Sequence, residues 1–257
     1  MASDQRWREM QVCAEAGDVS AVDHYVAEHG VGPGTINMLV HYAARGGQTK
    51  LVCFLLDEQH ASAASAMDGA VEGVSVDAVD GPHFDIVRLL LDPRPGEDPD
   101  DREGRTCDGF LESVHRGNQA FVSLFLGHIS PVIFAVGFNT AVRADNLHTM
   151  RFLSAHGEVN ATAGLQSSNP TAPDDVVCYL IEKGAINWPE HIYTRMGCSP
   201  DLVIHLYKFG IPRDLLVCGH EPIRFILDEH ARWCAHVRET LDELGVYAVL
   251  ANLIVQY

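Results

Sequence analysis

The residues with the clearest chemical potential are histidines and cysteines near the C-terminal end. His220, His230, Cys234 and His236 lie close together in the sequence, with Glu229 beside them. His230 and Cys234 are four residues apart, so in a helix both side chains would project from one face and could bind a transition metal. The spacings typical of zinc sites are absent, however. We therefore expect ordinary surface or core residues here and no metal.

Two cysteine–histidine pairs offer the side chains of a thiol nucleophile and its base, Cys107 with His115 and Cys198 with His205. A buried thiol is usually inert, because activation requires a partly exposed site with positive charge nearby. Nothing else in the sequence supports either pair. We predict that neither pair is catalytic.

Two further motifs have structural explanations. The glycine-rich segment 30–34 follows a predicted helix rather than a strand, and Pro33 spoils a phosphate cradle, so this segment is interpreted as a turn. The paired acids Asp174 and Asp175 stand where a helix is expected to begin, and they suit the helix dipole. The sequence therefore predicts a protein that is not an enzyme and that uses no cofactor.

The charge balance restricts the partners. The 257 residues carry a formal net charge of −17, and 47% of them are hydrophobic, which is an ordinary globular composition. An acidic body repels phosphate backbones and anionic lipid headgroups, so we expect neither nucleic acid nor membrane as a partner. A basic or neutral surface of another protein is favoured instead.

The sequence also indicates a reducing compartment. Residues 1–7 contain no apolar stretch typical of a secretory signal, and the apolar runs 132–138 and 246–255 are far too short to span a bilayer. The seven cysteines are odd in number and form no C-x-x-C motif, which favours reduced thiols. We expect a cytoplasmic protein, in a host cell's cytoplasm if it is an effector.

One pattern recurs along the chain: a helix of small residues, a tight turn, then a run of aliphatic residues. The clearest runs are 51–56, 86–91 and 121–126. The second aliphatic residues of successive copies lie 26 to 35 residues apart; they are Val22, Val52, Val87, Val122, Met150, Val177 and Val203. Seven occurrences near one period indicate internal repeats.

Each repeat is typical of two helices joined by a turn. The second helix has its apolar residues on one broad stripe, and small residues in the first helix permit close approach. Gly17, Gly47 and Gly117 stand at turns that favour a positive φ. Most of the polar residues after the turns can cap the second helix; these residues are Asp18, Gln48, His83, Asn118, Asn146 and Ser199. One pair cannot cover its own stripe, so we expect neighbours to stack.

These motifs resemble ankyrin repeats. Segments 42–56 and 78–91 are similar to the family's Ala-Ala-x-x-Gly-His turn and its x-x-Ile-Val-x-Leu-Leu-Leu helix, and 152–161 and 179–187 resemble the helix end with its Gly-Ala-Asp-Val-Asn hairpin. The resemblance covers roughly 6–210, lacks the Thr-Pro-Leu-His opening, and has short repeats in the second half. It implies an all-α, ankyrin-type helix-turn-helix solenoid of about seven repeats. It also implies that the hairpin asparagines, Asn160 and Asn187, hold loops by hydrogen bonds.

We therefore predict a single domain over 1–257, with repeats over about 6–218 and C-terminal capping helices over about 219–257. The acidic, proline-rich segment 92–103 is interpreted as a solvated insertion, with a docking loop for a basic partner as the alternative. The last predicted helix is apolar enough to bind a partner instead of capping. We expect a monomer.

The resemblance implies a concave binding face made of hairpin tips and the exposed end of each first helix. In this sequence the helix positions before each turn are Glu15, Arg45, Asp80, His115, Arg116, Arg143 and Arg195. The four arginines could grip carboxylates of a partner with paired hydrogen bonds. The alternative is that arginine is simply the default basic residue, since the chain has fifteen arginines and three lysines.

The sequence thus predicts a non-catalytic protein–protein interaction scaffold. An alternative is a viral or bacterial effector or adaptor that redirects a host complex such as a ubiquitin ligase, because scarce lysine limits ubiquitin attachment. No ligase-docking box is recognisable. A third hypothesis is a small hydrolase or metal enzyme that uses the C-terminal histidines and cysteine.

Overall fold

The computed structural model describes residues 2–74, 81–94, 97–185, 202 and 232. Twelve helices and no strand occur in these ranges, which confirms the predicted all-α class for them. The backbone contacts divide the chain into two compact units, Met1–Gly157 and Glu158–Tyr257. A division by contacts does not test independent folding, so the single domain stays a prediction.

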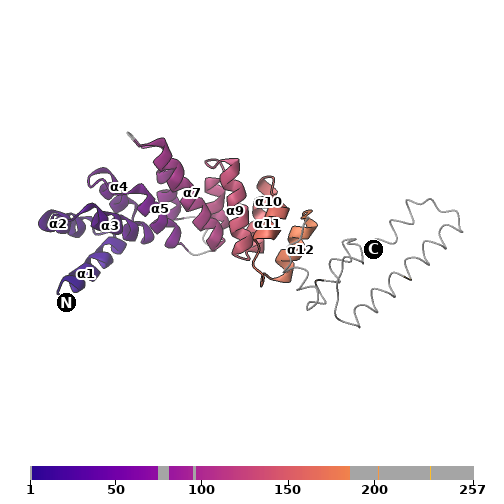
Figure 1. Cartoon of the computed structure of the whole chain (residues 1–257). Coiled ribbons are helices and arrows are strands. Elements are labelled where there is room, and N and C mark those ends of the chain that lie inside the picture. Colours follow the sequence, from indigo (N-terminus) through magenta and orange to yellow (C-terminus); the bar gives the residue numbers. More distant parts are fainter. Residues whose placement is uncertain (1, 75–80, 95–96, 186–201, 203–231, 233–257) are drawn as a thin grey trace. The chain divides into compact units, whose positions relative to one another are not determined.

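Consecutive helix pairs build the first unit, and Figure 1 shows their order along the chain. The pairs are α1 (Ala2–Ala16) with α2 (Val19–His29), α3 (Pro33–Arg45) with α4 (Thr49–Asp57), α5 (Ala63–Glu72) with α6 (Pro82–Leu91), α7 (Pro99–Arg116) with α8 (Gln119–Phe125), and α9 (Pro131–Arg143) with α10 (Leu147–His156). The two helices of each pair pack against each other. First helices pack in the order α1, α3, α5, α7, α9, and second helices in the order α2, α4, α6, α8.

The second unit has two helices in its described part, α11 (Ala161–Ser167) and α12 (Asp174–Glu182), and these pack together. Asn160 caps α11 by accepting a hydrogen bond from the amide three residues on, at 2.9 Å. Asp174 and Asp175 lie in the first turn of α12, as the dipole argument predicted. The predicted role of Asn187 and, Arg232 apart, the predicted capping helices fall outside the described residues.

The core lies between successive pairs. Six of the seven second aliphatic residues fall in the described ranges and all six are fully buried, as the repeat pattern requires; they are Val22, Val52, Val87, Val122, Met150 and Val177. Phe84 of α6 stacks on Phe121 of α8, with ring centroids 4.3 Å apart. Within the first unit, each pair therefore completes the core of its neighbour, which a lone pair could not do.

Left-handed residues make the turns within pairs, as predicted. Gly17, Gly47 and Gly117 have φ of 77°, 71° and 78°, and Asp145 takes this place in the fifth pair with φ of 53°. Aspartate tolerates the left-handed region better than most side chains. The fifth pair therefore keeps the left-handed backbone conformation at its turn although it lacks the glycine.

Three of the predicted caps are confirmed and two residues have a different role. Asp18, Asn118 and Asn146 each accept a hydrogen bond from the amide three residues on, at 3.0 Å. Gln48 instead donates to the carbonyl oxygen of Glu15 at 2.9 Å, and the ring of His83 lies 2.9 Å from the carbonyl oxygen of Arg45. Gln48 and His83 therefore connect a pair to the one before it. Ser199 falls outside the described residues.

The interpretation of 92–103 as an insertion loop was wrong in part, because α7 begins inside it. Asp98 accepts a hydrogen bond from the amide of Asp100 at 2.9 Å, and Pro99 occupies the first helical position. Asp100 and Asp101 lie in the first turn. Cap, proline and acids together are a helix start signal, and only the residues before Pro99 form the connection.

A buried arginine anchors this connection to the helices. Arg105 of α7 is 3% exposed, forms an ion pair with Glu97 and donates to the carbonyl oxygen of Leu90 at 2.6 Å. The hydrogen bond from Arg105 lowers the pKa of Glu97, with help from the Arg94 amide and against the effect of burial. The ion pair between Glu97 and Arg105 therefore fixes the connection just before α7 begins.

Glycines permit the first helices to approach one another closely. A Cβ on Gly69 would lie 2.1 Å from the carbonyl oxygen of His41, and one on Gly46 would lie 2.3 Å from that of Glu15. Both distances are far below contact, and the obstacle is backbone that cannot rotate away. These glycines set the spacing between first helices.

We expect Gly69→Ala to lower the free energy of unfolding by about 1–3 kcal/mol, because α5 must move away from α3. Gly104→Ala is the matched control: Gly104 lies inside α7 with nothing near its missing Cβ. The control should stabilise by about 0.5–1 kcal/mol through helix propensity. Urea denaturation measures both, and effects of the same sign would contradict the packing.

We expect Arg105→Ala to cost about 3 kcal/mol at pH 7, because it leaves a carboxylate and a carbonyl without their buried partner. The pKa of Glu97 is lowered on folding, so the ion pair stabilises fully above its ordinary value of 4.5 and loses this effect as pH falls through the lowered pKa. Urea denaturation at pH 7 and pH 3 should show the variant's deficit shrinking in acid. A deficit independent of pH would contradict this account.

Candidate functional site

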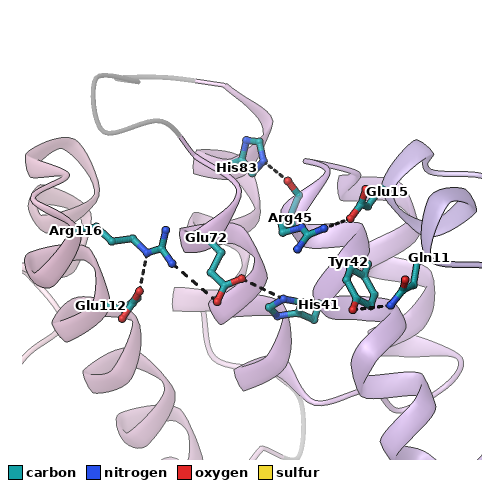
Figure 2. Close-up of polar contacts among 9 residues, drawn as sticks. All are labelled: Gln11, Glu15, His41, Tyr42, Arg45, Glu72, His83, Glu112 and Arg116. Carbon is teal, nitrogen blue, oxygen red and sulfur yellow. Dashed lines mark hydrogen bonds and ion pairs between the residues drawn. The ribbon is translucent and has the colours of Figure 1, made fainter. Parts of the chain in front are cut away.

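Charged side chains connect the exposed faces of neighbouring first helices, as Figure 2 shows. Glu15 of α1 forms an ion pair with Arg45 of α3. His41 of α3 lies 3.3 Å from a carboxylate oxygen of Glu72 in α5. The other oxygen of Glu72 lies 3.9 Å from the guanidinium of Arg116 in α7. Polar contacts thus run across four consecutive first helices.

Glu72 is the residue of this face that sequence reasoning missed. A Cβ on Gly73 would lie 2.2 Å from the carbonyl oxygen of Arg45, just as one on Gly46 would approach Glu15. Gly73 therefore occupies the position of Gly46, and Glu72 occupies that of Arg45.

The signal for this register was present in the sequence. Residues 69–73 read Gly-Ala-Val-Glu-Gly, and 43–46 read Ala-Ala-Arg-Gly, so each helix ends with small residues, a charge and a glycine. The prediction instead placed the third turn at Gly81, which has a positive φ of 127° but caps the start of α6. Asp80, the residue chosen from that register, lies outside the described ranges.

Two of the predicted arginines already bind carboxylates of their own chain. Arg45 is paired with Glu15, and its guanidinium lies 5.1 Å from the centre of the Tyr42 ring. Arg116 donates through Nε to Glu112 at 2.6 Å. Both arginines thus contact a carboxylate on a neighbouring first helix, and their binding to a partner's carboxylates stays a prediction.

The other predicted site residues are distributed differently. His115 is exposed near the end of α7, and Arg143 is exposed at the last position of α9. Arg195 falls outside the described residues. The structure thus brings Arg45, His115, Arg116 and Arg143 to the ends of successive first helices, as the repeat register requires.

A groove of about 560 Å³ lies on this face. Its lining comes from four first helices: His41 of α3, Asp68 and Glu72 of α5, Asp108, Leu111, Glu112 and His115 of α7, and Thr140 of α9. Four of these residues carry carboxylates, and none is lysine or arginine. The groove is therefore strongly acidic.

The carboxylates in the groove fall into two classes. Glu72 and Glu112 are bound by Arg116, and Glu72 also by His41. Asp68 and Asp108, in contrast, have no hydrogen bond or ion pair with the residues that the structure describes. Two carboxylates of the groove thus have no ion-pair partner among the described residues.

The surroundings of Asp68 disfavour its negative charge. Asp68 is exposed to water on one side, but neighbouring helices partly desolvate its carboxylate, which raises its pKa, and the charges of Asp108, Glu72 and Glu112 raise it further. Only His41 acts in the other direction. The groove therefore contains like charges held close together, an arrangement that a bound cation would relieve.

An apolar strip on α9 continues from the groove. Val132 and Val136 are 70% and 38% exposed. Val136 lies one helical turn from the groove residue Thr140, whose hydroxyl donates to the Val136 carbonyl at 3.0 Å. The face thus offers carboxylates on α5 and α7 beside aliphatic side chains on α9.

The pair of Cys107 and His115, which sequence analysis weighed as a nucleophile and base and rejected, lies apart in the structure. Cys107 and His115 lie in the same helix, and eight residues of helix separate them by about 12 Å along its axis. Burial, Asp108 and Glu103 raise the pKa of Cys107, so the thiol is not activated. Cys107 instead lines a second cavity of about 570 Å³, between the start of α7 and the connection after α8.

The described part of the chain shows no metal site and no membrane helix. No three His, Cys, Asp or Glu side chains gather there with a geometry that could hold a metal ion. The candidates His220, His230, Cys234 and His236, and the pair of Cys198 and His205, lie outside it. Within the same ranges, no helix has the length and apolarity that crossing a bilayer requires.

Comparisons of the chain with protein-family models, curated proteins and solved structures find no match. The groove and the packing that positions its walls are therefore the features that bear on function.

We expect Asp108→Asn to lower the pKa of Asp68 toward its ordinary value without reaching it, because burial remains the larger cause. Asp101→Asn, about two turns away on the same helix, is the control and should leave the pKa of Asp68 unchanged. Carboxyl carbon chemical shifts followed by NMR during a pH titration measure both.

The raised pKa of Asp68 also predicts whether its charge stabilises or destabilises the folded protein. Folding raises the pKa of Asp68, so its ionisation opposes folding at neutral pH, and this effect fades as pH falls through the raised value. Asp68→Asn should therefore not destabilise the protein at pH 7. A clear loss of stability at pH 7 would show that Asp68 has a partner in the fold.

Proposed function

We propose that this chain is a non-catalytic protein–protein interaction scaffold of ankyrin type, which presents the exposed face of its first helices to another protein. The observation that carries the proposal is the acidic groove, whose walls come from α3, α5, α7 and α9. A site assembled from four consecutive helix pairs is an extended surface rather than a pocket within one element. Extended faces of this kind suit a protein or peptide.

The packing supports a repeat solenoid. Within the first unit, contacts join each pair to the pairs next to it in sequence, and second aliphatic residues at the repeat spacing are buried in every described copy. Hydrogen bonds from Gln48 and His83 repeat the same link to the preceding first helix. A stack of this kind holds its first helices in a fixed order, and a binding surface needs such rigidity to limit the entropy lost on association.

The groove is a poor catalytic site. A carboxylate that acts as a general acid or base is usually held in a site that excludes water. Asp68 and Asp108 are exposed to solvent, so water is not excluded. Their unpaired charges are better explained by binding than by catalysis.

The thiols support a reducing location. Cys13, Cys53 and Cys107 form no disulfide with another described residue, and burial raises the pKa values of Cys53 and Cys107. Such thiols resist oxidation and suit the cytoplasm, which we propose as the location.

Site-specific photocrosslinking in cells that express the protein natively tests the proposal. A benzophenone amino acid in place of Val136 reports on the first-helix face, and the same amino acid in place of Leu89 reports on a second helix. The two sites are matched, since both side chains are aliphatic and 38% exposed. We expect Val136 to yield a discrete crosslinked protein and Leu89 to yield none. Crosslinks from Leu89 alone, or from neither site, would overturn the proposed function.

A further inference from the structure

We propose that the groove binds a partner segment in which an arginine or lysine enters between Asp68 and Asp108 while a nearby aliphatic side chain packs on Val132 and Val136. The inference rests on the proposed function, and it specifies the chemistry of the partner. Its elements are an uncompensated pair of carboxylates and an exposed apolar strip on the next helix.

Charge complementarity selects a cation. The lining has four carboxylates and no lysine or arginine, and the one arginine that reaches it, Arg116, is already shared by Glu72 and Glu112. Asp68 and Asp108 therefore form no ion pair within the described part of the chain, and only His41 acts on Asp68 from farther away. A guanidinium or ammonium group would replace repulsion between carboxylates by two charge-assisted hydrogen bonds. Nucleic acid would meet the same carboxylates with its phosphates and be repelled.

The cation is a side chain rather than a metal ion. No three metal-ligating side chains come together here in the described residues, whereas one guanidinium needs only two carboxylates. The exposed strip on α9 adds an apolar contact that an isolated ion would not use. Val132 and Val136 lie one turn apart on the helix that follows α7 in the stack.

The geometry of packed helices sets the spacing in the partner. Axes of packed helices lie roughly 8–10 Å apart, so the apolar strip on α9 lies about that far from the carboxylate of Asp108 on α7. A segment in the polyproline II conformation has three residues per turn and rises about 3.1 Å per residue, so the side chain three positions away lies on the same face and covers this distance. The partner segment should therefore have a basic residue followed or preceded by an aliphatic residue three positions away.

Fluorescence anisotropy with the full chain and synthetic peptides tests this inference. The probe is a twelve-residue peptide with three copies of Arg-Ser-Ser-Leu, and the controls replace either every arginine by glutamate or every leucine by serine. We expect the probe to bind at physiological salt, the serine control to bind several-fold more weakly, and the glutamate control not to bind. Equal binding of the arginine and glutamate peptides would overturn the inference.

Two double variants that remove the same charge distinguish binding at the groove from nonspecific attraction to an acidic chain. Asp68→Asn with Asp108→Asn should weaken binding of the probe by about tenfold, the effect expected for losing two charge-assisted contacts. Asp23→Asn with Glu58→Gln removes the same charge from exposed positions in the middle of α2 and directly after α4, and it should change the affinity less than about twofold. Equal losses in the two double variants would overturn the inference.

A second pair of substitutions tests the apolar strip. Val132→Ser with Val136→Ser should reduce binding of the Arg-Ser-Ser-Leu peptide by several-fold and leave the serine control unchanged. Circular dichroism verifies that each variant is folded, since all the changed side chains are exposed. If Val136 crosslinks to a partner but the arginine peptide fails to bind, the proposed function stands and the partner chemistry is wrong.

Discussion

Burial of one helix pair's apolar stripe by the next pair is the interaction on which this structure depends. Each second helix has a broad aliphatic stripe, and its own first helix is too small to bury that stripe away from water. Val52 and Val87 are fully buried only because adjacent pairs meet. The order of the pairs in space therefore follows their order in sequence, and the first helices must line up with it.

The order in which the pairs stack determines which side chains meet on the exposed face of the first helices. Glycine spacing brings α3 and α5 so close that the side chain of Glu72 reaches His41, and the next pair places Arg116 within reach of the same carboxylate. These contacts pair Glu72 and Glu112 with cations, whereas Asp68 and Asp108 have no ion pair with the residues that the structure describes. The acidic groove is therefore a product of stacking, because no single helix contains it.

The sequence predicted the parts of the fold that depend on local chemistry. Turn glycines, three asparagine or aspartate caps and buried aliphatic residues follow from helix physics within one repeat. The pairing of Arg45 with Glu15 and the role of Glu72 depend on register between repeats, and a period that varies from 26 to 35 residues does not define it. The start of α7 was available from Asp98 and Pro99, a cap followed by proline, but the acidic composition favoured a loop.

Nuclear Overhauser contacts between isotope-labelled aromatic, methyl and glycine protons would test the stacked packing most directly. Packing only between adjacent pairs predicts contacts of the Phe84 ring with Phe121 and of the Phe110 ring with Gly137, which lies against it in the next pair. It also predicts that the protons of α1 show no contact with those of α7 or α9. Strong contacts between such distant pairs would contradict the stack and, with it, the groove.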